Sequence, residues 1–170
     1  MRKTDEAATR VFDPEFAFFG PIGYDVGNII ANLFFAWGNG KVSGDESFCT
    51  WIMETAGSVI DIFKQKFLSA FNEQATEIMA KTEGFARFYL DTIIADAAAY
   101  TGTELIRRTI GMAPVKDLTA IGDEKKRAQV SRLNIIAAKQ FIFDRRNIHD
   151  GNSFVDIFLD SAKDAGLCRG

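Results

Sequence analysis

The sequence predicts a mainly α-helical protein with one short β segment near its N-terminus. Apolar residues recur at spacings of three and four over several long stretches, which is the period of a helix with one buried face. Gly and Pro residues separate these stretches and mark turns between helices. The 170 residues include 16 Phe, and 47% are hydrophobic, so the chain has enough apolar surface for the core of one domain.

The β segment is expected at residues 10–12. It ends before Asp13, because Pro14 has no N–H to donate to a neighbouring strand. A bend follows at Gly20, Pro21 and Gly23. These glycines lack the Lys-Ser/Thr ending of a phosphate-binding loop, so a turn and close helix packing account for Gly20, Gly23 and Gly27.

The first helix is expected to run from Asp25, its N-cap, to Trp37, with Gly38-Asn39-Gly40 as its end. Ser43 or Asp45 is expected to cap the second helix, and both Trp37 and Trp51 are expected in the core. The remaining helices are predicted at residues 46–80, 85–112, 123–145 and 153–165.

Composition argues against several classes of function. The net charge is −3 and no basic stripe separates from the acids, which argues against a nucleic-acid partner. A single histidine, His149, excludes a His-based metal cluster in this chain and is expected at the surface. Cys49 and Cys168 are far apart in sequence and are expected to be reduced thiols. The apolar runs are too short to cross a membrane, so a cytoplasmic protein without a membrane partner is expected.

Asp13 and Glu15 are candidate metal ligands. In an extended segment, residues two apart point to the same side, so their carboxylates would converge. Such hard oxygen ligands suit Mg²⁺, which binds one or two carboxylates together with phosphate oxygens. Pro14 restricts the backbone between them. Asp-Pro-Glu also occurs in ordinary turns, so its context carries the interpretation.

That context is the stretch FDPEFAFFGPIGYDVGNIIAN, residues 12–32. With the residues that follow, as far as Trp37, it resembles S-methyl-5-thioribose kinases, which have the kinase-like fold of aminoglycoside phosphotransferases. The resemblance implies that residues 1–170 are the helical C-terminal lobe of that fold, with ATP and Mg²⁺ as cofactors. It implies that Asp13, Pro14 and Glu15 bind the cofactor, with both acids on the metal, as the DFG Asp does in protein kinases. Asp25 would brace the catalytic loop, a role compatible with an N-cap.

A second similarity lies in ELIRRTIGMAPVKDL, residues 104–118. The same family carries a twin arginine in a late helix, which implies that Arg107 and Arg108 bind the sugar or the transferring phosphoryl group. A planar guanidinium suits phosphate and vicinal hydroxyls. Consecutive helix residues diverge by about 100°, so the two arginines need not reach one ligand. Arg108 could instead form an ordinary surface pair with Glu104.

The resemblance therefore predicts an ATP-dependent kinase that phosphorylates methylthioribose at its 1-hydroxyl in methionine salvage, and a homodimer. The N-terminal lobe and catalytic loop of such a kinase are expected to be absent from residues 1–170, since residues 1–12 hold no His-Gly-Asp segment. The general-base Asp would lie upstream, and the chain alone is expected to be inactive. Exposed Phe16, Phe18 and Phe19 are expected where that loop would pack.

Two alternatives remain open. One is a related small-molecule kinase with another acceptor, such as a different sugar or an aminoglycoside. The other is a catalytically dead helical module that binds a sugar phosphate or a protein partner.

Overall fold

The computed structural model describes residues 2–3, 9–10 and 17–168. The helices are α1 (Ile22–Ser43), α2 (Glu46–Gln74), α3 (Phe85–Ile110), α4 (Lys116–Thr119), α5 (Glu124–Phe143) and α6 (Gly151–Asp164), with 3₁₀ turns η1 (Met79–Lys81) and η2 (Arg145–Asn147). Two short strands, β1 (Arg2–Lys3) and β2 (Thr9–Arg10), pair antiparallel. The predicted mainly helical fold is confirmed. Arg10 of the predicted β segment lies in β2, and residues 11–12 lie outside the described residues.

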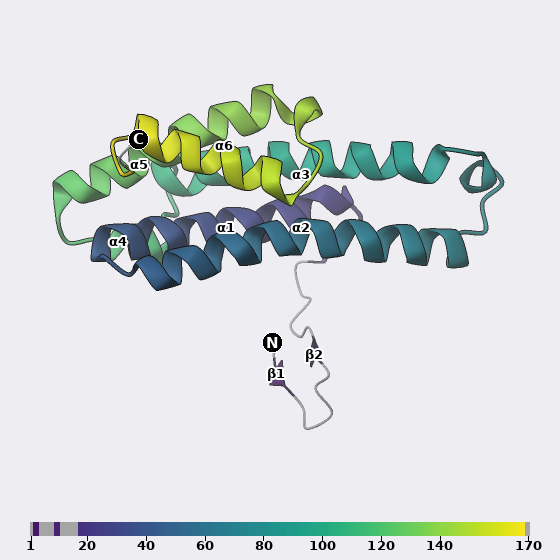
Figure 1. Ribbon diagram of the computed structural model, residues 1–170, viewed down its shortest axis with the longest axis horizontal. Helices are drawn as coiled ribbons and strands as arrows, with labels where there is room; N and C mark the ends of the chain where they lie inside the picture. Colours follow the sequence, from purple (N-terminus) through teal and green to yellow (C-terminus); the bar gives the residue numbers. More distant parts are fainter. Residues whose placement is uncertain (1, 4–8, 11–16, 169–170) are drawn as a thin grey trace.

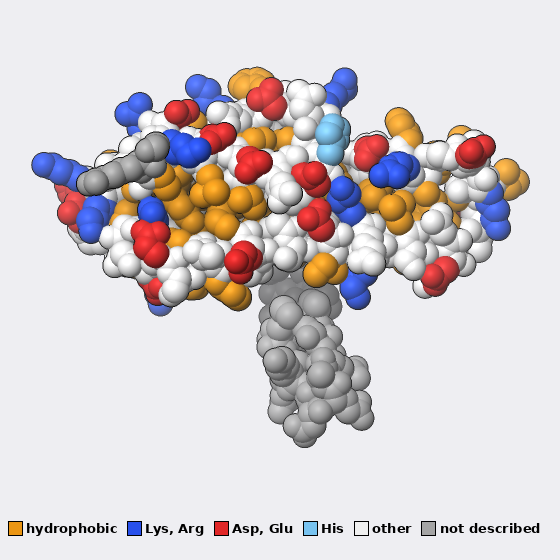
Figure 2. Space-filling view, viewed as in Figure 1, with side chains coloured by type: hydrophobic (Ala, Val, Ile, Leu, Met, Phe, Trp, Pro, Cys, Tyr) orange, Lys and Arg blue, Asp and Glu red, His pale blue; other side chains and the backbone are white. Residues whose placement is uncertain are grey.

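The helices form an elongated bundle in which α1 and α2 lie side by side (Figure 1). The helix α3 packs on α1 and α5, while α6 packs on α2 and α5. Acidic and basic side chains are interspersed over the face in Figure 2, with apolar side chains between them. No helix in the described part of the chain is long and apolar enough to cross a bilayer.

The centre of the bundle is a group of phenylalanines from three helices. Phe34 of α1 stacks on Phe158 of α6, with ring centroids 3.9 Å apart, and on Phe141 of α5 at 5.8 Å. Trp37 meets Phe158 edge to face at 5.4 Å. All four side chains are buried, so this group fixes α1, α5 and α6 against one another.

Two glycines let α1 approach α3 more closely than larger residues would allow. A Cβ at Gly27 would lie 2.6 Å from the carbonyl oxygen of Ala97, and one at Gly23 would lie 2.7 Å from the Ala97 nitrogen. The Thr101 hydroxyl donates to the Gly27 carbonyl at 3.3 Å across this contact. The expected role of Gly23 and Gly27 in close packing is confirmed.

The predicted bounds of the first helix are wrong at both ends. It begins at Ile22, with Pro21 as its N-cap, so Asp25 lies inside the first turn. It continues through Gly38-Asn39-Gly40 to Ser43, because these residues are packing positions: a Cβ at Gly38 would lie 2.6 Å from Val130 Cγ1. The turn into left-handed backbone occurs later, at Gly44.

The second helix is also shorter than predicted, ending at Gln74. The chain reverses there so that α3 packs back on α2, with Phe71 against Phe85 and Tyr89. Trp51 is 55% exposed and not in the core, because the buried stripe of α2 runs through Ile52, Ala56 and Ile60.

Other predicted features are confirmed. Asp45 caps α2 by accepting from the Phe48 N–H at 3.0 Å, and Asp123 caps α5. His149 is exposed, and Trp37 is buried. Phe18 and Phe19 are exposed, as expected, while Phe16 lies outside the described residues.

We predict that Gly27→Ala destabilises the fold by about 2 kcal/mol, because the new methyl group meets the α3 backbone, which has no flexible side chain to move away. Gly122→Ala is the matched control, since nothing lies within 4 Å of a Cβ placed there. Urea unfolding followed by circular dichroism measures both changes. Equal stability of the two variants would contradict the close contact of α1 with α3.

Candidate functional site

Three of the predicted site residues, Asp13, Pro14 and Glu15, lie outside the described residues. The structure describes the other three, Asp25, Arg107 and Arg108. It places the arginines in the last turn of α3 and Asp25 in the first turn of α1.

Arg107 and Arg108 converge on one carboxylate, that of Glu104. Arg107 donates through Nε to Glu104 Oε2 at 2.6 Å and through Nη2 to Oε1 at 2.8 Å. Arg108 donates through Nε to the same Oε1 at 2.9 Å and through Nη1 to the Ala113 carbonyl at 3.1 Å. The two arginines thus belong to a single cluster, although they are adjacent in the helix.

Glu104 is the buried member of this cluster. Its side chain is 7% exposed, whereas those of Arg107 and Arg108 are 52% and 32% exposed. Burial raises the pKa of the Glu104 carboxyl, but hydrogen bonds from Arg107 and Arg108 outweigh burial and hold that pKa below its usual range. The ionised carboxylate is therefore the stable form, and the cluster carries a net charge of +1 at neutral pH.

Aromatic side chains lead from the start of α1 to this cluster. Phe18 meets Tyr24 edge to face at 5.6 Å, and Tyr24 meets Tyr100 at 5.3 Å. Tyr100, Glu104 and Arg107 are spaced four and three residues apart, so they lie on one side of α3. The hydrogen bonds to Glu104, together with the negative charge of its carboxylate, raise the pKa of Arg107.

The last turn of α3 is held by a hydrogen bond from α5. Asn134 of α5 is fully buried and donates through Nδ2 to Thr109 Oγ1 at 3.2 Å. This bond fixes the last turn of α3, which carries the arginines.

Asp25 is exposed and is not the N-cap of α1, which is Pro21. Its negative charge still favours the helix, because it lies near the positive end of the helix dipole. The structure leaves the Asp25 side chain accessible to another segment.

Comparison with known proteins shows which proteins this chain is similar to. It is 34% identical to a methylthioribose kinase of Bacillus pumilus, over 94% of this chain and 39% of that kinase. It is 38% identical to the methylthioribose kinase of Exiguobacterium sibiricum, over 73% of this chain and 31% of that kinase. The chain is a relative of the methylthioribose kinases. Methylthioribose kinase 1 of Oryza sativa subsp. japonica is 29% identical over 82% of this chain and 36% of that kinase. No family model matches the chain.

This methylthioribose kinase relative spans about two fifths of the length of the curated relatives that it matches. The similarity covers both α3, with its arginines, and nearly all of the remaining bundle. The predicted resemblance to methylthioribose kinases is confirmed.

Glu104 was predicted only as a surface partner of Arg108, but it is buried and pairs with both arginines. The spacing of Glu104 to Arg107 and Arg108, three and four residues, could have indicated that one acid serves both arginines. Its burial could not be read from that spacing, because it depends on packing between helices.

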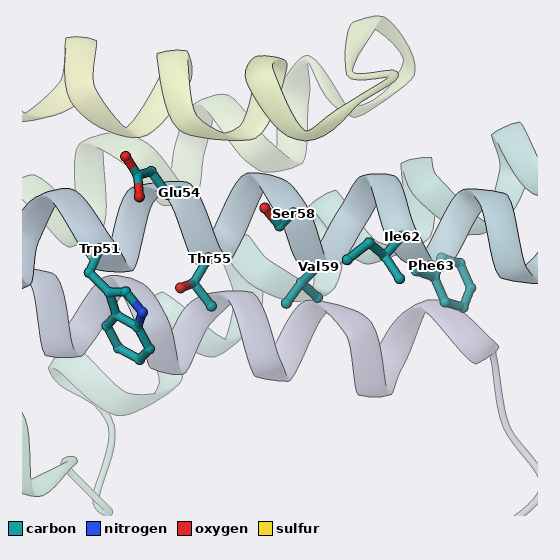
Figure 3. Close-up of a pocket in the computed structure, with 7 residues that line it drawn as sticks. All are labelled: Trp51, Glu54, Thr55, Ser58, Val59, Ile62 and Phe63. Carbon is teal, nitrogen blue, oxygen red and sulfur yellow. The ribbon is translucent and has the colours of Figure 1, made fainter. Parts of the chain in front are cut away.

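A surface hollow lies elsewhere, along α2. Figure 3 shows its lining residues in a row on that helix, from Trp51 to Phe63. Neither arginine lines it, and the hollow is shallow and mostly apolar. Within the described residues, no three His, Cys, Asp or Glu side chains could hold a metal ion together. Of the predicted site residues that the structure describes, the two arginines lie together at the end of α3.

We predict that Glu104→Gln lowers the free energy of unfolding by about 2 kcal/mol at pH 7, because it weakens charge-assisted hydrogen bonds to both arginines. The pKa of Glu104 is lowered in the folded state. The contribution of the ionised Glu104 carboxylate to the free energy of unfolding is therefore complete at pH values above its unfolded-state pKa of about 4.3. It is lost as the pH falls through its folded-state pKa. Urea unfolding of the wild type and of Glu104→Gln between pH 7 and pH 2 should show that the difference in their free energies of unfolding becomes smaller as the pH falls.

The control for this measurement is Glu124→Gln. Glu124 is 88% exposed and lies 3.8 Å from Arg127, so its replacement should change stability by less than about 0.5 kcal/mol at any pH. A Glu104→Gln difference that stays constant with pH would contradict the assignment.

Proposed function

We propose that this chain forms the helical lobe of a methylthioribose kinase. The reaction is the ATP-dependent transfer of the γ-phosphoryl group to the 1-hydroxyl of S-methyl-5-thioribose, in methionine salvage. The observation that carries the proposal is the clustering of Arg107 and Arg108 on one buried carboxylate, in a chain related over most of its length to methylthioribose kinases.

The arginines would bind oxygen atoms of the sugar or of the transferring phosphoryl group. Arg107 is the more exposed of the two and has a net positive neighbourhood, which favours an anion or an oxygen-rich ligand. Because phosphoryl transfer depends on positioning and charge stabilisation, guanidinium groups fixed in place suit the reaction.

Asp13 and Glu15 would hold Mg²⁺. Two hard carboxylates with open positions for phosphate oxygens fit the ligand preference of that ion. The bound ion would neutralise charge on the phosphates of ATP. Exposed Asp25 would accept hydrogen bonds from the catalytic loop and hold it in shape, and the general base would come from that loop.

The same proposal includes a cytoplasmic homodimer. The interspersed charges and net charge of −3 favour a small-molecule substrate over nucleic acid or a membrane surface.

We predict that Arg107→Ala lowers kcat/KM for methylthioribose about a hundredfold in the native protein purified from its own cells, because a charged hydrogen bond to the transition state is lost. Conversion of methylthioribose to its 1-phosphate, followed by ³¹P NMR with ATP and Mg²⁺, measures this. Arg132→Ala on α5 is the control and should leave the rate unchanged, since Arg132 is exposed and forms no ion pair within residues 17–168.

The same assay distinguishes the other candidate functions. Turnover of a different sugar or an aminoglycoside, but not of methylthioribose, would favour a related kinase that phosphorylates another acceptor. Ligand binding without turnover of any acceptor would instead favour the inactive binding module.

A further inference from the structure

Both oxygens of the Glu104 carboxylate are engaged by the two adjacent arginines. Oε2 accepts one hydrogen bond, from Arg107 Nε, and Oε1 accepts two, from Arg107 Nη2 and Arg108 Nε. Because the Glu104 side chain is only 7% exposed, its carboxylate needs such partners, since burial without them would favour its neutral form. The three side chains therefore form one unit whose centre is Glu104.

This unit restrains two side chains that are ordinarily mobile. An exposed arginine samples many rotamers, and ordering one costs side-chain entropy. Arg107 is half exposed, yet two hydrogen bonds to one carboxylate fix the plane of its guanidinium. Arg108 is fixed at both ends, by Glu104 and by the Ala113 carbonyl.

The restraint leaves one terminal nitrogen of each guanidinium open. Arg107 Nη1 and Arg108 Nη2 make no hydrogen bond to any other residue in the part of the chain that the structure describes. With one negative and two positive groups, the unit keeps an excess positive charge. An oxygen-rich ligand would meet donors that are already oriented, so less entropy is lost on binding.

We propose that Glu104 is a positioning residue that holds the Arg107 and Arg108 guanidinium groups in the orientation used to bind oxygen atoms of the sugar or phosphoryl group. The ligand in this inference rests on the proposed function, whereas the restraint on the arginines does not. Glu104 does not touch the ligand itself, and acts through the two arginines.

The first measurement is the order of the arginine Nε–H groups in the 170-residue chain, by ¹⁵N relaxation and hydrogen exchange. We expect the Nε–H groups of Arg107 and Arg108 to be as ordered as the backbone and to exchange at least about tenfold more slowly than that of exposed Arg132. Nε–H groups of Arg107 and Arg108 as mobile as that of Arg132 would overturn the inference, and this wild-type comparison needs no variant.

Two variants then test the role of the carboxylate. Glu104→Gln keeps the side-chain length but offers one uncharged acceptor, and Glu104→Asp keeps the charge but is one methylene shorter. Each should release at least one Nε–H group while Glu124→Gln, the exposed control, releases none. Helical circular dichroism confirms that each variant is folded. Arginines that remain ordered in folded Glu104→Gln would overturn the inference.

The second measurement is methylthioribose binding to the native protein by calorimetry. Glu104→Gln should weaken binding about tenfold, and KM should rise more than kcat falls, as expected for loss of ligand orientation. Unchanged affinity with released arginines would overturn the role in binding. If the wild-type protein binds no methylthioribose, the proposed function fails, while the Nε–H measurement still decides whether Glu104 positions the arginines.

Discussion

The close approach of α3 to its neighbours is the constraint on which the rest of the structure depends. Gly23 and Gly27 bring the α1 backbone against α3, and Gly102 does the same for α5, where a Cβ would lie 2.6 Å from the Ala138 carbonyl oxygen. With its backbone held on two sides, α3 has a fixed rotation and register. That rotation sets Tyr100 against Tyr24 and points Glu104 into the bundle while Arg107 stays at the surface.

Within this frame, competing electrostatic effects set the chemistry of the end of α3. Desolvation opposes a charged carboxylate at Glu104, and paired guanidinium groups favour it. The hydrogen bonds from the arginines outweigh desolvation because three short bonds satisfy both carboxylate oxygens. The buried carboxylate neutralises only one of the two guanidinium charges. The remaining positive charge lies at the surface, where a ligand can reach it.

Sequence predicted the starts of α2 and α5, where apolar periodicity agrees with the caps Asp45 and Asp123, but not the start of α1, where Asp25 lies inside the first turn. Prediction from sequence also failed where one residue type can have two structural roles. Gly38 and Gly40 read as a helix end, yet they are packing positions inside α1, and only tertiary contacts distinguish the two. Trp51 was predicted in the core as part of the apolar stripe of the second helix, although it lies beside the buried residues of that stripe. The arginines of the site were predicted from a family motif, but the burial of Glu104 was not, since it depends on the rotation of α3. Asp13 and Glu15 stay predictions.

The most direct test of the account is a crystal structure of the native protein with bound methylthioribose. We expect an oxygen of the sugar within about 3 Å of the Arg107 guanidinium, with Glu104 still bonded to both arginines. A sugar bound elsewhere, for example in the hollow along α2 beside Trp51, would contradict it, because the arginines would then be structural and the site would have to be sought on another helix.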